Sequence, residues 1–243
     1  MQSKLDTKSL LIGLLMLMMS LAAVSPARAG SVNKSVTIED GAVSSGESSV
    51  NGSITVGNGA TVNGSLETVN GAIRIGSDSR VGDVETVNGS IKVGTNSTTG
   101  DIGGVNGSIR LASNVVVDGE ISVVNGKILL DRGSRVGGDV TNVNGEFEIV
   151  GSEIGGGLST VNGDVLLADG STLRGDLLVE RPSGWGWKNN RKPRIVIGPG
   201  STVGGEIRLE RKVELFIHDT ASVGGVSGEM TFDDAVRFSG NRP

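Results

Sequence analysis

The sequence lacks the residues that most globular and secreted proteins use to hold a core together. In its 243 residues there is no cysteine and no tyrosine, and aromatic residues make up 2% of the chain. Without cysteine, a disulfide framework and a lipid-modified cysteine are excluded. Because bulky aromatic residues are scarce, Val, Ile and Leu must supply nearly all of the apolar volume. The net charge of −5 is modest for this length and gives no indication of nucleic-acid binding.

Glycine, by contrast, is abundant, with 40 residues, while proline contributes only 5. Asn, Ser and Val are also frequent. This composition is typical of many short strands joined by tight turns. It predicts an all-β protein.

The first 29 residues have the layout of a secretory signal peptide. Lys4 and Lys8 lie in a charged head, an apolar run covers residues 10–24, and small residues stand three and one places before Gly30. The run is short for a membrane span. We therefore expect residues 1–29 to be cleaved, no transmembrane span to remain, and the mature chain to reach the periplasm or the cell surface. An uncut membrane anchor is the alternative.

The strongest signal is an internal repeat of 18 or 19 residues. Its marker is the tripeptide Val-Asn-Gly. Six of its asparagines, at this spacing, are Asn70, Asn88, Asn106, Asn125, Asn144 and Asn162. Asparagine tolerates the left-handed region and its amide can bond the amides above and below, so a stack of repeats would turn this column into a structural asparagine ladder.

Within one repeat, apolar and polar residues alternate in three short segments. Ile73 and Ile75 share one face and Arg74 the other, and Ser79 and Val81 share a face in the next segment. Turns rich in Gly, Asn and Asp separate the segments. Three strands and three turns make a triangular coil. Since one coil cannot bury its own Val and Ile, the coils must stack, about 4.8 Å apart, as a single-stranded parallel β-helix.

This solenoid is expected to cover residues 30–229 in roughly ten coils, with a rise of about 4.8 Å for each coil. Residues 181–194 interrupt the repeat as an inserted loop. Residues 230–243 leave the repeat and carry Phe232 and Phe238, so we interpret them as a C-terminal cap.

The units at 134–140 and 201–207, Ser-Arg-Val-Gly-Gly-Asp-Val and Ser-Thr-Val-Gly-Gly-Glu-Ile, resemble the repeat of bactofilins. The resemblance covers roughly residues 36–225 and implies a right-handed, triangular β-helix in a polymer-forming protein. Bactofilins are typically cytoplasmic or membrane-associated, whereas this chain begins with an export signal. The Val-Asn-Gly-Ser-Ile units are also similar to those of adhesins built from repeated β-strands in the bacterial envelope.

A left-handed helix is the second architecture that the spacing allows. Val69, Ile75 and Val81 are six residues apart, as in hexapeptide-repeat acyltransferases, but the register breaks at Val123-Val124. A right-handed helix is therefore preferred. Those acyltransferases use a histidine base, and the single histidine here, His218, has no identifiable partner and is interpreted as a solvated or corner residue.

Acidic residues recur at the third corner of the coil, and such a column could bind Ca²⁺. The glycine-rich calcium nonapeptide is absent, so we interpret these acids as solubilising turn residues and expect no metal and no cofactor. The residues are Asp83, Asp101, Glu120, Asp139, Asp176 and Glu206. No acid–base constellation is visible, so no catalytic residue is assigned and the chain is not expected to be an enzyme.

Two features are candidate binding surfaces. The first is an outward column on the first strand of the coil, which begins with Arg74, Lys92 and Arg110 and is read on through Leu129, Glu148, Leu166 and Val196 to Arg208. The second is the inserted loop, whose candidate binding residues are Trp185, Trp187, Lys188, Arg191 and Lys192. Exposed Trp beside cations suits glycan stacking or a protein partner.

Three classes of function follow from these observations. The first is an exported structural or polymer-forming scaffold of the bacterial cell envelope, which self-associates into filaments. The second is an adhesin-like module that recognises an envelope glycan or protein through the Trp and basic loop. A carbohydrate-active β-helix enzyme comes last, since no acid–base pair supports it.

Overall fold

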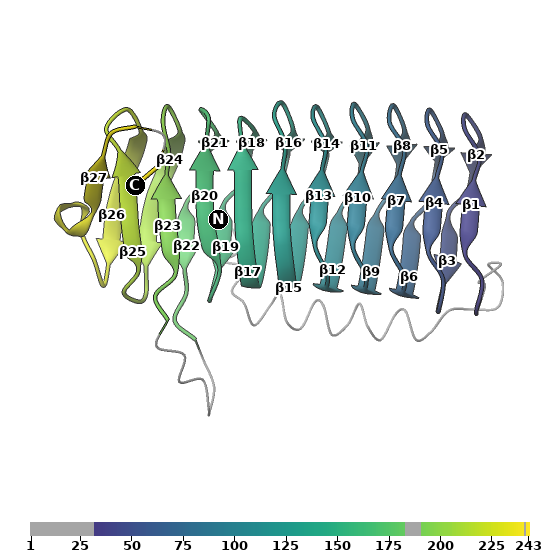
Figure 1. Ribbon diagram of the computed structural model, residues 1–243, viewed down its shortest axis with the longest axis horizontal. Helices are drawn as coiled ribbons and strands as arrows, with labels where there is room; N and C mark the ends of the chain where they lie inside the picture. Colours follow the sequence, from purple (N-terminus) through teal and green to yellow (C-terminus); the bar gives the residue numbers. More distant parts are fainter. Residues whose placement is uncertain (1–31, 183–190, 241) are drawn as a thin grey trace, which may run out of the picture.

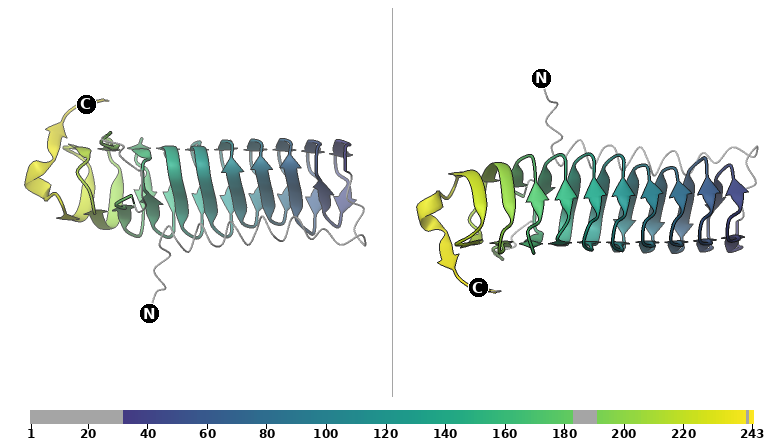
Figure 2. Two further views of the ribbon diagram at one scale, coloured as in Figure 1. Left: turned by 90° about the horizontal axis from the view of Figure 1, so that it is seen from below. Right: turned by 90° about the horizontal axis from the view of Figure 1, so that it is seen from above.

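The computed structural model of the chain describes residues 32–182, 191–240 and 242–243. It is an elongated rod of parallel strands wound into a solenoid of about ten turns (Figures 1 and 2). The all-β, parallel-solenoid prediction is confirmed. Its strands form three columns, which we call stacks 1, 2 and 3 in the order in which the chain visits them.

Stack 1 faces the viewer in Figure 1 and follows each Val-Asn-Gly corner. Its strands pair in exact repeat register, with Ile73 beside Ile91 and Arg74 beside Lys92. The stack contains β1 (Val36–Ile38), β4 (Ile54–Val56), β7 (Ile73–Ile75), β10 (Ile91–Val93), β13 (Ile109–Leu111), the later parts of β15 (Ile121–Leu130) and β17 (Val140–Val150), β20 (Asp164–Ala168), β23 (Arg194–Ile197), β25 (Glu214–His218) and β27 (Val236–Phe238).

Stack 2 is built from two-residue strands that end at the third corner. From β5 to β24 each contributes one buried and one more exposed residue, as Val81 and Arg80 do in β8. The stack contains β2 (Val43–Ser44), β5 (Thr61–Val62), β8 (Arg80–Val81), β11 (Thr98–Thr99), β14 (Val116–Val117), β16 (Arg135–Val136), β18 (Glu153–Ile154), β21 (Thr172–Leu173) and the first parts of β24 (Thr202–Leu209) and β26 (Ser222–Gly228).

Stack 3 leads into the Val-Asn-Gly corner. The corner does not always interrupt the strand, because β15 and β17 run through it from stack 3 into stack 1. The stack contains β3 (Glu47–Ser49), β6 (Leu66–Asn70), β9 (Val84–Asn88), β12 (Ile102–Asn106), the first parts of β15 and β17, β19 (Leu158–Thr160), β22 (Leu177–Val179) and the later parts of β24 and β26.

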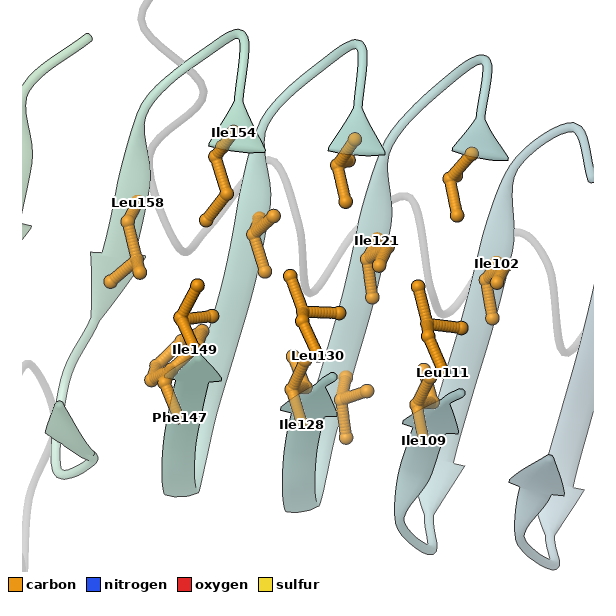
Figure 3. Close-up of a cluster of buried hydrophobic side chains, with 14 of the residues drawn as sticks. Ile102, Ile109, Leu111, Ile121, Ile128, Leu130, Phe147, Ile149, Ile154 and Leu158 are labelled. Carbon is orange, nitrogen blue, oxygen red and sulfur yellow. The ribbon is translucent and has the colours of Figure 1, made fainter. Parts of the chain in front are cut away.

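The core is a continuous pile of Ile, Leu and Val between the three stacks. Figure 3 shows Ile109, Ile128 and Phe147 at the same strand position in three successive coils of stack 1. Ile102, Ile121 and Leu158 point toward them from stack 3. All six are at most 1% exposed. Full burial of each such side chain stabilises the fold by about 1.5–3 kcal/mol. Phe147 is the one fully buried aromatic residue among those described.

One coil is longer than the others. Val165 pairs with Ile195, thirty positions later, whereas its neighbour on the other side is Phe147, eighteen positions earlier. The additional residues lie in the sequence between β22 and β23, and the described ones among them belong to no strand. Insertions in the turns leave the inward and outward faces of the strands in register.

At the C-terminal end a short 3₁₀ helix, η1 (Phe232–Asp234), precedes β27. β27 is one more strand of stack 1, pairing with β25, so the segment that we expected to leave the repeat returns to it. Among the described residues, no helix is long and apolar enough to cross a membrane.

Candidate functional site

The asparagine column is hydrogen bonded from end to end. Each Nδ2 donates to the Oδ1 of the asparagine one coil before, at 2.8–3.0 Å, from Asn51 bonding Asn33 to Asn162 bonding Asn144. The ladder therefore includes two more asparagines, Asn33 and Asn51, than the six singled out from the sequence. Each amide supplies a donor to one neighbour and an acceptor to the other, so the corner polarity is met inside the column.

Arg211 ends this ladder. Its guanidinium donates to Asn162 Oδ1 at 2.8 Å, to the Val161 carbonyl at 3.1 Å and to the Arg191 carbonyl at 2.7 Å. Burial lowers the pKa of Arg211. The coil that contains the insertion has no Val-Asn-Gly corner, and the arginine supplies the donor that the next asparagine would have given. Sequence reasoning missed Arg211, because nothing in the repeat marks it.

The basic column lies on the outward face of stack 1. Arg74, Lys92 and Arg110 are exposed and stand side by side on β7, β10 and β13. Arg110 pairs with Asp131, at 2.9 Å. Within the described part of the chain, no carboxylate comes within ion-pair distance of Arg74 or Lys92. Two stacked cations thus have no counter-charge on the rod.

The lower half of that column is not as the sequence suggested. After Arg110 the column continues through Leu129, Glu148, Leu166 and Val196, and then reaches Phe216. Arg208 was assigned to it in error. It lies on stack 3, next to Leu178, because the chain has not yet completed its coil at Arg208 and returns to the column only at Phe216.

Stack 3 carries the opposite charge at the same coils. Glu67 and Glu85 are neighbours on the outward face of β6 and β9, and Asp83, Asp101 and Glu120 stand at the corner that leads into this stack. None of the five forms an ion pair with a described residue. Burial, with the charges of Glu67, Asp83 and Asp101, raises the pKa of Glu85 to about 7.

The corner acids also hold backbone. Asp83 Oδ1 accepts from the Asp101 N–H at 2.9 Å, and Asp101 Oδ1 accepts from the Glu120 N–H at 2.8 Å. The same contact recurs from Asp139 to Gly157 and from Asp176 to Glu206. In the described ranges, no group of three or more His, Asp or Glu side chains is placed to hold a metal ion. These acids thus tie one coil to the next.

The described residues include the two ends of the inserted loop. Trp185, Trp187 and Lys188 lie outside the described residues. At one end, Arg181 bonds the Glu210 carbonyl at 3.1 Å and Glu229 at 2.5 Å. At the other end, Arg191 forms an ion pair with Asp164, and Lys192 is exposed.

His218 is buried, and its ring is hydrogen bonded within the turn that follows β25. Its Nδ1 accepts from the Thr220 N–H at 3.0 Å, and its ring meets Phe238 edge-on at 5.0 Å between centroids. The corner assignment holds, but the side chain is only 7% exposed, so the solvated alternative is wrong. The Phe238 contact joins β25 to β27, whereas the Thr220 hydrogen bond stays within the turn that follows β25.

Comparison of the chain with family models, with curated proteins and with solved structures finds no match. Function is therefore argued from the rod itself.

Proposed function

We propose that this chain is an exported structural protein of the bacterial cell envelope that polymerises end to end. The observation that carries the proposal is the state of the two ends of the rod. β1, β2 and β3 pair on one side with β4, β5 and β6, and no described residue pairs with their other edges. At the far end, β26 and β27 likewise pair on one side only.

Open strand edges are templates for further pairing. In β1, Val36 N–H donates to Ser53 O and Ile38 O accepts from Gly57 N–H, so both residues bond toward β4. Because backbone groups alternate along a parallel strand, the N–H and C=O of Thr37 point away from the rod. Val43 in the same coil is 73% exposed. A second copy that adds its last strands here would satisfy the backbone and cover the apolar residue.

The bactofilin-like repeat and the signal-peptide layout are consistent with this proposal, and the proposal assigns no catalytic residue. The asparagine ladder and the corner acids bond one coil to the next along the axis of the rod, which suits a structural role. In this reading the asparagine ladder, the corner acids and Arg211 are structural.

The experiment is electron microscopy of the protein purified from cells that express the full chain. Filaments are expected, with Thr37→Pro shortening or abolishing them. Proline removes the outward N–H and is tolerated on an edge strand whose N–H faces solvent. Thr37→Val, which keeps the backbone donor, is the matched control. Single rods in the wild type, or filaments unaffected by Thr37→Pro, contradict the proposal.

A second candidate function is recognition of an envelope glycan or protein by residues 181–194. The contacts at the two described ends of this segment favour it, because Arg181 pairs with Glu229 and Arg191 with Asp164 on the rod. Replacing residues 182–193 with Val-Asn-Gly should then abolish binding to isolated envelope polysaccharide while the thermal midpoint stays within a few degrees. Unchanged binding after that replacement contradicts this function.

A further inference from the structure

The basic and acidic columns lie on different sides of the same three or four coils. The basic side consists of Arg74, Lys92 and Arg110 on stack 1. The acidic side consists of Glu67, Asp83, Glu85, Asp101 and Glu120 on and beside stack 3. The two sides meet at the asparagine corner, which β15 crosses directly, and both lie in the N-terminal half of the rod (Figure 1).

Apart from Arg110, which pairs with Asp131, the charges of the two columns have no counter-charge among the described residues. Like charges on neighbouring strands destabilise a sheet. Here Arg74 is the strand neighbour of Lys92, and Glu67 is the strand neighbour of Glu85. No ion pair joins the two columns, because one faces outward from stack 1 and the other from stack 3. Of the eight side chains, only Arg110 has a partner of opposite charge in the described chain.

We propose that the basic side of one rod binds the acidic side of a second copy of the same chain, with the two rods parallel and side by side. Each column rises by one strand spacing, about 4.8 Å, for each coil. Two parallel rods at equal height therefore bring each cation level with carboxylates of the neighbour. Each copy still has one free basic or acidic side, so the contact can continue to further copies.

A second copy fits better than a separate polyanion, because it matches both columns with one contact. An acidic polymer would neutralise Arg74 and Lys92 but leave the five carboxylates unmatched. Burial and, after it, the charges of Glu67, Asp83 and Asp101 raise the pKa of Glu85, so the carboxylates on that side act on one another. This side-by-side contact adds a lateral dimension to the proposed end-to-end polymer, and it requires no open strand edge.

The test is sedimentation velocity in the Thr37→Pro background, so that end-to-end growth does not contribute and the outcome does not depend on the proposed function. We expect assemblies larger than one chain in buffer of about 0.02 M salt, and single chains at about 1 M salt, where the Debye length falls to about 3 Å. Single chains at both salt concentrations overturn the proposal.

Two charge-reversal variants identify the surfaces. Arg74→Glu/Lys92→Glu should sediment as a single chain at low salt, and so should Glu67→Lys/Glu85→Lys. An equal mixture of the two should assemble again, because each then offers the sign that the other lacks. Arg80→Glu/Lys212→Glu has the same change in net charge as the first variant, at exposed positions outside both columns, and should assemble like the parent.

The mixture is the decisive arm, since two misfolded variants would not restore each other. Circular dichroism of each variant alone checks that the β-solenoid is retained. Should the mixture remain monomeric while both variants are folded, the lateral contact is wrong. Should the parent remain monomeric but bind polyglutamate through Arg74 and Lys92, the basic side serves an acidic polymer instead and the proposal is overturned.

Discussion

Two glycines of one coil, Gly104 and Gly107, should respond in opposite ways to the same substitution. Gly104 lies in the middle of β12, between Thr86 and Val123 on the inward side of stack 3. A Cβ at this position would lie 3.8 Å from Thr86 O and 3.9 Å from Val123 Cγ2, which is ordinary contact. Gly107, three residues later, has φ of +154°, and its Cβ would lie 1.8 Å from the carbonyl oxygen of Gly89.

We therefore expect Gly104→Ala to stabilise the rod. Reduced freedom of the unfolded chain contributes about 0.4–1 kcal/mol, and one buried methyl group contributes about 0.8 kcal/mol. The expected gain in the free energy of unfolding is about 1–2 kcal/mol, or about 2–4 °C in Tm for each kcal/mol at this chain length. Gly107→Ala should instead cost about 1–3 kcal/mol for the backbone conformation alone, and more because a backbone carbonyl must move.

The assay is urea unfolding followed by far-ultraviolet circular dichroism, with the slope m compared between variants. An unchanged m and a higher midpoint for Gly104→Ala, together with a lower midpoint for Gly107→Ala, is the expected pattern. If Gly104→Ala destabilises the protein, or if the two substitutions shift the midpoint equally, the packing described for the inward side of stack 3 is wrong.

Three further predictions concern a core position, a raised pKa and the end of the ladder. Val136→Asp buries an unpaired charge and should cost more than about 3 kcal/mol, whereas Arg135→Asp, on the outward side, should cost less than about 1 kcal/mol in the same urea assay. Equal losses would refute the assignment of faces. Folding raises the pKa of Glu85 to about 7, so ionisation of Glu85 destabilises the fold as pH rises through 7. Glu85→Gln should therefore raise Tm at about pH 8 and leave it unchanged at about pH 4, and an effect that does not depend on pH contradicts this. Arg211→Ala leaves Asn162 Oδ1 and two carbonyls without their donor and should cost about 1–3 kcal/mol, and a cost that Arg211→Lys removes in full would show that charge matters there and the guanidinium hydrogen bonds do not.

Much of the fold could be predicted because the 18- or 19-residue repeat is visible in the sequence. Alternation places Ile73 and Ile75 inward and Arg74 outward, and the stack repeats that choice coil after coil. The period of the asparagines fixes the coil length, and the amide chemistry fixes the ladder. The Val-Asn-Gly marker does not reveal that β15 and β17 run through the corner without a break, since strand continuity depends on the pairing of both neighbours.

The candidate surfaces were harder to predict. The sequence places Arg74, Lys92 and Arg110 in one column, because they occupy the same position of consecutive repeats. It does not show that Glu67 and Glu85 lie at the same height on the next side. These residues occupy a different position of the repeat, and only the winding of the coil brings the two positions around one corner.

The sequence by itself determined which residues of each coil face the core, how long a coil is, and that the coils stack. The facing of the residues follows from the alternation of apolar and polar side chains, and the coil length follows from the repeat period. Only the tertiary structure decided what the long coil does to that count. That coil brings Arg211 to Asn162, forty-nine positions away. The tertiary structure also placed Arg208 on stack 3, because the column continues from Val196 to Phe216. A period predicts contacts between equivalent positions, whereas a contact across an insertion depends on where the chain re-enters the stack.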